Sequence, residues 1–183
     1  MRRALAAAAL ALVVQPAAAS FDVPALMRLL GTAKDLELPY VERRYSPILV
    51  APVESSGTLV YHRPEVVEKI VAKPRRERLR ILLDEVVVER DGKEQRLAFA
   101  SAPALAGLAA SIRGVLSGDA ALLETHFDLK IGGDEAAWTL DLTPKDDTLR
   151  SRLEGIVVSG HGGRVAKVET FEASGDRTVT EIR

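Results

Sequence analysis

Short β-prone runs, each ended by a turn residue, occupy most of this chain and restrict it to an antiparallel, β-rich fold. The runs are rich in Val, Ile, Leu, Thr and Tyr, and they are separated by turns such as Arg63-Pro64, Asp91-Gly92 and Gly175-Asp176. Connections this short join antiparallel neighbours, because parallel neighbours need a long crossover. Eleven strands are therefore predicted, at residues 40–48, 57–63, 65–73, 77–83, 85–90, 93–99, 126–131, 136–142, 153–160, 164–174 and 177–182.

Three helices are predicted before and between these strands. The first lies within residues 21–34, where Pro24 suits a first helical turn and Asp22 is the expected N-cap. The other two lie within residues 101–126 and are separated by Gly118 and Asp119. A curved antiparallel sheet must cover its inner face, and these helices are the elements available to do so. The predicted fold class is mainly β (α+β), with one curved antiparallel sheet covered by three helices that act as a lid.

The N-terminal segment has the layout of a secretory signal peptide. Two arginines precede an apolar run that ends at Val14, and small residues follow up to Ala19. The apolar run is too short to cross a bilayer as a helix. The chain has no cysteine, so neither a disulfide nor a lipid anchor on an N-terminal cysteine is expected. We therefore predict a signal peptide at residues 1–19 and one mature domain at residues 20–183, exported to the periplasm.

Composition narrows the class of partner. The net charge of -1 argues against a nucleic-acid surface. Aromatic residues make up 4% of the chain, so its interior must be aliphatic, which suits a hydrophobic cargo better than stacking on bases or sugars. A basic run between Lys73 and Arg80 is interpreted as a solvated strand edge or as a contact for a headgroup or an acidic partner.

The residues that usually carry catalysis are not arranged for it. His62, His126 and His161 lack the spacing of metal ligands, and none of the serines lies in a G-x-S-x-G motif. The glycine pairs lie between two β-prone runs, where they predict hairpin turns and not a phosphate-binding helix start. Neither an enzymatic activity nor a metal or cofactor is therefore predicted.

One motif gives the chain a family resemblance. Gly57, Leu59, Tyr61, Arg63 and Pro64, followed by a strand that ends near Pro74, resemble the LolA-like family of outer-membrane lipoprotein carriers. The order of signal, helix, strands, paired helices and closing strands agrees with that family. Segments such as FDVPALMRLL, LSGDAALLETHF and AAWTLDLTP are similar to a branch found with aryl-polyene or xanthomonadin-type lipid systems. The resemblance implies an unclosed β half-barrel that helices cover and that has no catalytic residues.

Strand parity selects the residues that are expected to face a cavity or its lid. In residues 57–63 the alternation puts Leu59, Tyr61 and Arg63 on one face. For the other candidates a packed core remains an alternative, because core walls and cavity walls are both aliphatic. Strand 65–73 has a charged residue on either face, so its orientation stays open. The remaining candidates are Leu79, Ile81, Leu83, Leu105, Leu108, Ile112, Phe127, Leu129, Trp138 and Leu140.

Arg63 has the most specific expected role. At the mouth of an apolar cavity its guanidinium needs acceptors, and the carbonyls at the C-terminus of a lid helix would supply them. Such charge-assisted bonds contribute roughly 1.5–3 kcal/mol each, so they would close the lid and break on loading. A solvated arginine before a turn proline is the alternative interpretation.

These observations together lead to an expected function. The chain is expected to be a monomeric periplasmic carrier of a lipid or acylated cargo. It would receive this cargo from an inner-membrane exporter and deliver it to an outer-membrane acceptor. The alternative is a sensor or adaptor of the same fold that detects lipid or lipoprotein and signals by binding a partner, and proteins of that type usually carry a second domain.

Overall fold

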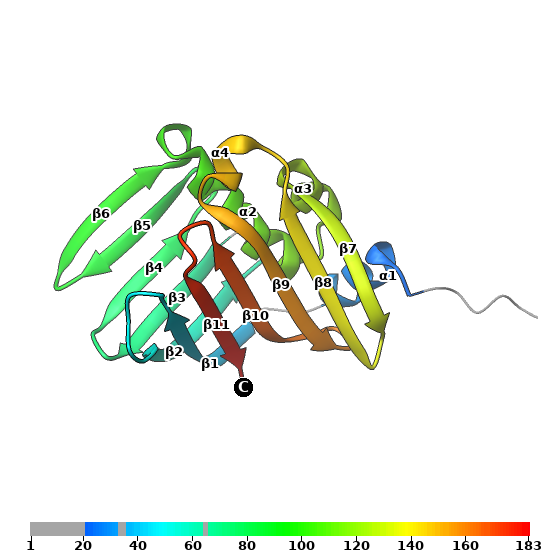
Figure 1. The fold of residues 1–183 in the computed structure, drawn as a ribbon, viewed down its shortest axis with the longest axis horizontal. Helices are drawn as coiled ribbons and strands as arrows, with labels where there is room; N and C mark the ends of the chain where they lie inside the picture. The colour runs from blue at the N-terminus through cyan, green and yellow to red at the C-terminus, as the bar shows by residue number, and fades with distance from the viewer. Residues whose placement is uncertain (1–20, 33–35, 64–65) are drawn as a thin grey trace, which may run out of the picture.

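A single antiparallel sheet of eleven strands curves around the helices (Figure 1). The computed structural model describes residues 21–32, 36–63 and 66–183, so the predicted signal peptide lies outside the described residues. The strands follow the spatial order β6-β5-β4-β3-β2-β1-β11-β10-β9-β8-β7. Their bounds are β1 Leu36–Tyr45, β2 Val53–His62, β3 Val66–Lys73, β4 Glu77–Ile81, β5 Glu85–Arg90, β6 Lys93–Ala98, β7 Phe127–Asp134, β8 Ala137–Pro144, β9 Leu153–His161, β10 Arg164–Glu172 and β11 Arg177–Ile182.

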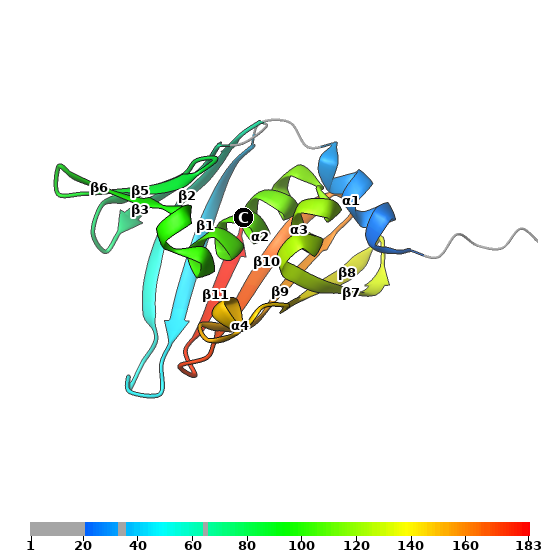
Figure 2. The same ribbon diagram turned by 90° about the horizontal axis from the view of Figure 1, so that it is seen from above.

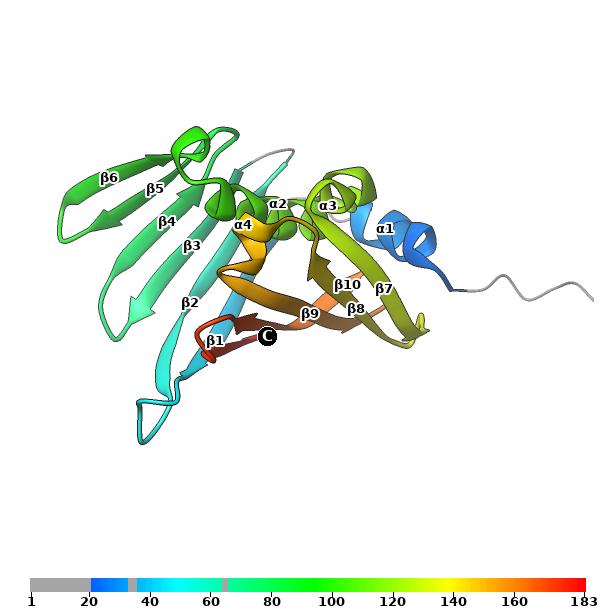
Figure 3. The same cartoon turned by 45° about the horizontal axis from the view of Figure 1, so that its top comes forward.

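This arrangement confirms the predicted fold class and the number of strands. Each strand pairs antiparallel with its neighbour, and the C-terminal β11 pairs with β1 to join the two halves of the sheet. Strands β6 and β7 end the sheet on opposite sides and are not paired with each other, so the half-barrel is open (Figure 3).

The helices lie on the concave side of the sheet (Figure 2). The three predicted helices are confirmed, and none of the described helices combines the length and apolar character that a membrane span requires. Two short helices, η1 and α4, were not predicted, because each consists of a single turn. The bounds are α1 Val23–Gly31, η1 Phe99–Ser101, α2 Pro103–Ser117, α3 Ala120–His126 and α4 Asp147–Arg150.

Local signals in the sequence explain where the helices begin and end. Asp22 caps α1, as predicted, by accepting a hydrogen bond from the backbone N–H of Ala25 at 2.9 Å. Gly118 ends α2 with a φ of +69°, in the left-handed region that favours glycine. A Cβ atom at Gly118 would lie 2.2 Å from the carbonyl oxygen of Met27, so the ends of α1 and α2 are in backbone contact. Only glycine satisfies both requirements at this position.

Buried side chains form two separate clusters beneath the helices. The larger cluster lies between α1, α3 and the strands β7 to β9, and it includes Trp138, Leu140 and Leu142 of β8. The smaller cluster lies under the N-terminal half of α2 and consists of Tyr61, Val67, Ile81, Val86 and Ala109. The middle of the sheet lies between the two clusters, where the helices cover it less completely.

Several predicted strand bounds are wrong; β1 and β2, for example, each begin four residues earlier than predicted, at Leu36 and Val53. Residues 46–48 were assigned to the first strand, but β1 ends at Tyr45 and Ile48 is 90% exposed on the loop that follows. Leu83 was predicted to face inward, but β4 ends at Ile81 and Leu83 is 62% exposed on the turn before β5. Both aliphatic runs continue past the last paired residue, and the pattern of the sequence does not show where the hydrogen bonding to the neighbouring strand stops.

The exposed loop leads to a first prediction. Replacing Ile48 and Val50 together with serine is expected to change the free energy of unfolding by no more than about 0.5 kcal/mol, because Val50 is fully exposed and Ile48 nearly so. Urea unfolding of both proteins, followed by circular dichroism, measures the difference. A loss well above 1 kcal/mol would mean that the loop is packed against the sheet.

Both edge strands of the sheet carry exposed charged side chains. All six residues of β6 are exposed, and Lys93, Glu94 and Arg96 are charged. On β7, the other edge, Asp128 is exposed. Charged side chains on an unpaired edge oppose the addition of another strand.

Candidate functional site

An apolar hollow lies between helix α2 and the middle of the sheet. Its volume is about 200 Å³, and we call it the central cavity. Helix α2 forms its roof, and strands from both halves of the sheet form its floor. The lining residues are Glu42, Leu59, Lys69, Leu108, Ser111, Ile112, Val115, Leu116, Leu142, Ile156, Val158, Val165, Val168, Thr170, Thr178, Thr180 and Ile182.

Two further cavities adjoin the central cavity and extend it into a trough. The first, of about 340 Å³, shares Val115, Leu116, Val165 and Ile182 with it and extends toward the end of α1; we call it the helix-side cavity. The second, of about 300 Å³, shares Glu42 and Lys69 with it and extends toward β4; we call it the polar cavity. The trough therefore has an apolar middle and a charged end.

Helix α2 is held by its small residues, and this leaves its large ones to face the trough. A Cβ atom at Gly107 would lie 2.8 Å from Leu149 of α4, and one at Gly114 would lie 2.6 Å from Leu123 of α3. Neighbouring helices therefore pack tightly against the glycine face of α2. The opposite stripe includes Leu108 and Ile112, and Ile112 is 42% exposed while it lines the central cavity.

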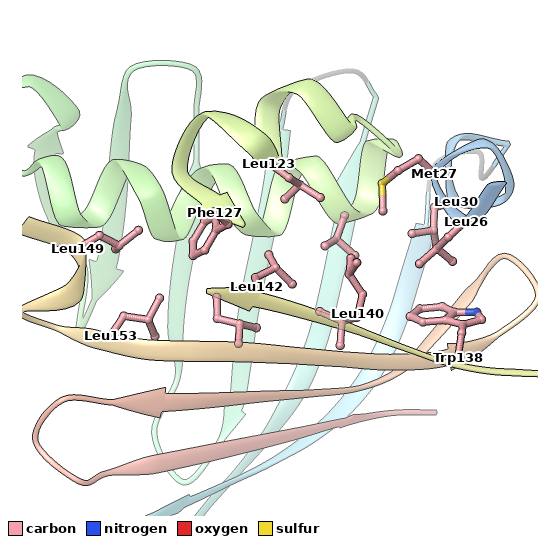
Figure 4. Packing of buried hydrophobic residues seen from close by; sticks show 13 residues of the cluster. Leu26, Met27, Leu30, Leu123, Phe127, Trp138, Leu140, Leu142, Leu149 and Leu153 are labelled. Carbon is pink, nitrogen blue, oxygen red and sulfur yellow. The ribbon is translucent and has the colours of Figure 1, made fainter. Parts of the chain in front are cut away.

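The structure places the predicted site residues in several different environments. Leu59, Leu108 and Ile112 meet in the central cavity. Tyr61 and Ile81 are buried in the smaller cluster, and Leu79 and Leu105 pack against it. Phe127, Trp138 and Leu140 are buried in the larger cluster, and Leu129 packs against it. Figure 4 shows Phe127, Leu140 and Trp138 among leucines of the helices, in packed core. Leu83 faces solvent and belongs to none of these groups.

Arg63 lies where a lid contact was expected. Its Nη1 atom donates a hydrogen bond of 2.7 Å to the carbonyl oxygen of Gly31, the last residue of α1. This is the predicted type of acceptor, because carbonyls at the C-terminus of a helix carry the negative end of its dipole. The contact ties the end of β2 to the end of α1. Whether it controls the opening of the trough stays a prediction.

A polar group on the floor of the trough was not predicted. Lys69 of β3 reaches across β2 to Glu42 of β1, and its Nζ lies 2.8 and 2.7 Å from the two carboxylate oxygens. The path is open because Gly57, which has no side chain, lies between Tyr40 and Val71 in the register. The hydroxyl groups of Thr180 and Ser55 also donate to the Glu42 carboxylate, at 2.9 and 3.4 Å. This pairing settles the orientation of β3, since Lys69 faces inward.

Tyr40 is buried beside this ion pair. The ammonium of Lys69 lies 5.3 Å from the centre of its ring, within the range of a cation–π contact. The buried Tyr40 hydroxyl has no hydrogen-bond partner among the described residues. Burial raises the pKa of Tyr40 to about 12, and the carboxylate of Glu42 acts in the same direction. The hydroxyl therefore keeps its proton at neutral pH and remains a hydrogen-bond donor.

A sequence signal for this group existed in the strand parity. Glu42 shares its parity with Leu38 and Tyr40, and Lys69 shares its parity with Val67 and Val71. Each charge thus interrupts an apolar face, but only the shared neighbour β2, which pairs with both β1 and β3, brings the two charges together. Within residues 21–32, 36–63 and 66–183, no group of three or more His, Asp or Glu side chains is arranged to hold a metal ion.

Comparison with solved structures finds matches at low sequence identity and with TM-scores below 0.5. A LolA superfamily protein, NE2245 of Nitrosomonas europaea, is 11% identical, with a TM-score of 0.47 over 90% of this chain and 92% of that chain. The lipoprotein LppX of Mycobacterium tuberculosis is 11% identical, with a TM-score of 0.45 over 88% and 93% of the two chains. The MucA/MucB complex of Pseudomonas aeruginosa contains a chain that is 16% identical, with a TM-score of 0.45 over 88% of this chain and 56% of that chain.

Comparison at the level of families is more direct. None of the curated proteins matches the chain. A family described as outer membrane lipoprotein carrier protein LolA-like matches residues 15–182, which is nearly the whole sequence. The open sheet with its covering helices agrees with that match. The chain therefore belongs to the LolA-like family of outer membrane lipoprotein carrier proteins.

Proposed function

We propose that this protein is a periplasmic carrier that holds a lipid or an acylated cargo in the trough beneath α2. One observation carries the proposal most directly. The stripe of α2 that includes Leu108 and Ile112 faces the aliphatic floor of the sheet across a cavity. These two apolar surfaces stay apart, although direct packing against each other would bury both of them. An apolar cavity of this kind suits an alkyl chain, because each methylene taken out of water contributes about 0.8 kcal/mol.

The proposed route passes from the inner membrane to the outer membrane. The segment 1–19 would act as a cleaved signal for export, and an inner-membrane exporter and an outer-membrane acceptor would be the partners. Segments such as FDVPALMRLL and AAWTLDLTP resemble the aryl-polyene branch of the family, and this resemblance supports a polyene or other acylated lipid as the cargo. The bond between Arg63 and Gly31 would hold α1 closed in the empty carrier.

Two measurements test the proposal. Protein recovered from the periplasm is expected to release lipid on extraction with organic solvent, as detected by mass spectrometry. The purified protein is also expected to bind the neutral fluorescent probe N-phenylnaphthylamine. Ile112→Glu places a charge on the cavity wall and is expected to weaken probe binding roughly tenfold or more, since an unpaired charge in apolar surroundings is strongly unfavourable.

The control uses the same substitution on an exposed leucine. Leu83→Glu adds the same charge outside the trough, so probe binding should match that of the wild type. If the periplasmic protein released no lipid and the wild type bound no probe, the carrier function would be wrong. Equal weakening by both substitutions would show that the probe does not bind in the trough.

A further inference from the structure

The ion pair between Lys69 and Glu42 lies at the junction of two chemically different spaces. Both residues line the apolar central cavity and also the polar cavity. An alkyl chain that fills the central cavity therefore ends at this ion pair or passes it. Both side chains are largely covered, with 28% and 19% of their surface exposed. Among the residues that line the central cavity, Lys69 and Glu42 are the charged ones.

Stability alone does not account for an ion pair in this position. Removing two charges from water is costly, and well-packed apolar residues often stabilise a protein as well as or better than a covered ion pair. The equivalent positions on neighbouring strands are apolar, since Lys69 pairs with Leu59 on one side and with Leu79 on the other. An aliphatic side chain at residue 69 would continue that surface.

The hydrogen bonds of the pair leave donors available and leave few acceptors. The carboxylate of Glu42 already accepts from Lys69, Thr180 and Ser55. An ammonium has three N–H donors, and the two side-chain hydrogen bonds of Lys69 both go to this one carboxylate, which leaves one donor. The floor thus offers the remaining donor of Lys69 to whatever binds there.

The charges of the polar cavity act in the same direction. Lys69, Arg75 and Arg90 line it together with the carboxylates of Glu42 and Glu77. Arg90 forms an ion pair with Glu77, and Arg75 lies 3.8 Å from Asp91 on the exposed rim. Each cation is thus paired with a carboxylate, but an arginine carries five N–H donors, so the lining still has more donors than its carboxylates accept.

From this arrangement we infer that the trough selects a cargo whose alkyl chain carries a hydrogen-bond acceptor, namely a carboxylate, a phosphate or an ester carbonyl. Lys69 donates to this group while the chain fills the central cavity. The inference rests on the proposed carrier function and adds the chemical class of the cargo. A purely hydrocarbon chain, or one that ends in an alcohol, would leave the donors of the floor without an acceptor of comparable strength.

The experiment compares ligands that differ only in the polar group. Affinities are measured by displacement of N-phenylnaphthylamine with dodecanoate, dodecyl phosphate, methyl dodecanoate and dodecanol. The wild type is expected to bind at least one of the first three about tenfold more tightly than dodecanol, as one charge-assisted hydrogen bond would give. The compound that binds most tightly identifies the acceptor as a carboxylate, a phosphate or an ester.

A double variant and a matched control test the role of Lys69. Lys69→Met with Glu42→Gln removes both charges without leaving one unpaired, and it is expected to bind the acceptor ligand and dodecanol with similar affinity. Lys167→Met alters a comparable pair, in which Lys167 lies 2.6 Å from Glu169 outside the cavities, and should keep the preference of the wild type. Thermal unfolding by circular dichroism shows that each variant is folded.

The possible failures are distinguishable. If the wild type bound all four ligands equally, or if the double variant kept the preference, the inference about the acceptor would be overturned while the carrier function stood. If the wild type bound neither the probe nor any of the four ligands, the carrier function would be overturned. If Lys167→Met also abolished the preference, the preference would depend on the net charge of the protein. The role of Lys69 would then be overturned.

Discussion

Replacing Trp138 with alanine is expected to lower the free energy of unfolding by about 3–5 kcal/mol. The side chain is 1% exposed and belongs to the larger cluster, in which Leu26 and Leu30 of α1 lie over it (Figure 4). Its Nε1 atom donates a hydrogen bond of 2.9 Å to the carbonyl oxygen of Gly162. A Cβ atom at Gly160 would lie 2.5 Å from the ring, so the indole is in close contact with β9. Alanine would leave a cavity and an unpaired carbonyl group.

Urea unfolding followed by circular dichroism measures this loss. Circular dichroism is required because Trp138 is the only tryptophan of the chain, and its fluorescence disappears with the substitution. Leu83→Ala is the control, since this leucine is exposed and should change the free energy of unfolding by less than about 0.5 kcal/mol. A loss below 1 kcal/mol for Trp138→Ala would contradict the view that α1 is held on the sheet by tight packing around the indole.

The second large effect is expected for Arg63→Leu. This substitution removes the hydrogen bond from the guanidinium to the carbonyl of Gly31, which as a charge-assisted bond contributes roughly 1.5–3 kcal/mol. The population in which α1 is released is therefore expected to rise about tenfold to a hundredfold. Because closure of the lid and the cargo compete for the same trough, the variant is also expected to release its cargo more slowly than the wild type.

Hydrogen exchange and release kinetics together test this role. The backbone amides of residues 26–31 are expected to exchange faster in Arg63→Leu, and a preloaded fluorescent fatty acid should dissociate more slowly. Arg63→Lys keeps a cation, so its exchange and dissociation rates should lie between those of the wild type and those of Arg63→Leu. Arg78→Leu removes an arginine whose partner is Glu68, 3.6 Å away, and should behave as the wild type. Unchanged exchange and unchanged release in Arg63→Leu would show that the arginine does not control the lid.

Much of the fold could be predicted from local patterns in the sequence. Turn residues and alternation identified all eleven strands, and Asp22 and Pro24 identified the start of α1. These features depend on residues close together in the chain. The ends of the strands were less accurate, as Ile48 and Leu83 show, because an aliphatic residue continues the pattern whether or not it has a partner strand.

The candidate site was less predictable, because it depends on contacts between distant segments. Leu140 and Leu59 both lie on inward faces, yet Leu140 is fully buried in packed core and Leu59 lines a cavity. The difference comes from the helices above them, since α1 and α3 cover β8 closely while α2 is held away from the middle strands. Lys69 could not be oriented for the same reason, because its partner Glu42 lies two strands away.

The charged edge described for β6 has a consequence for how the protein behaves in a crowded compartment. An open sheet has unpaired edge strands, and an apolar edge would let copies of the protein pair edge to edge into fibres. Lys93, Glu94 and Arg96 would have to be stripped of water in any such joint. The sheet can therefore remain open while its charged edge strand discourages polymerisation.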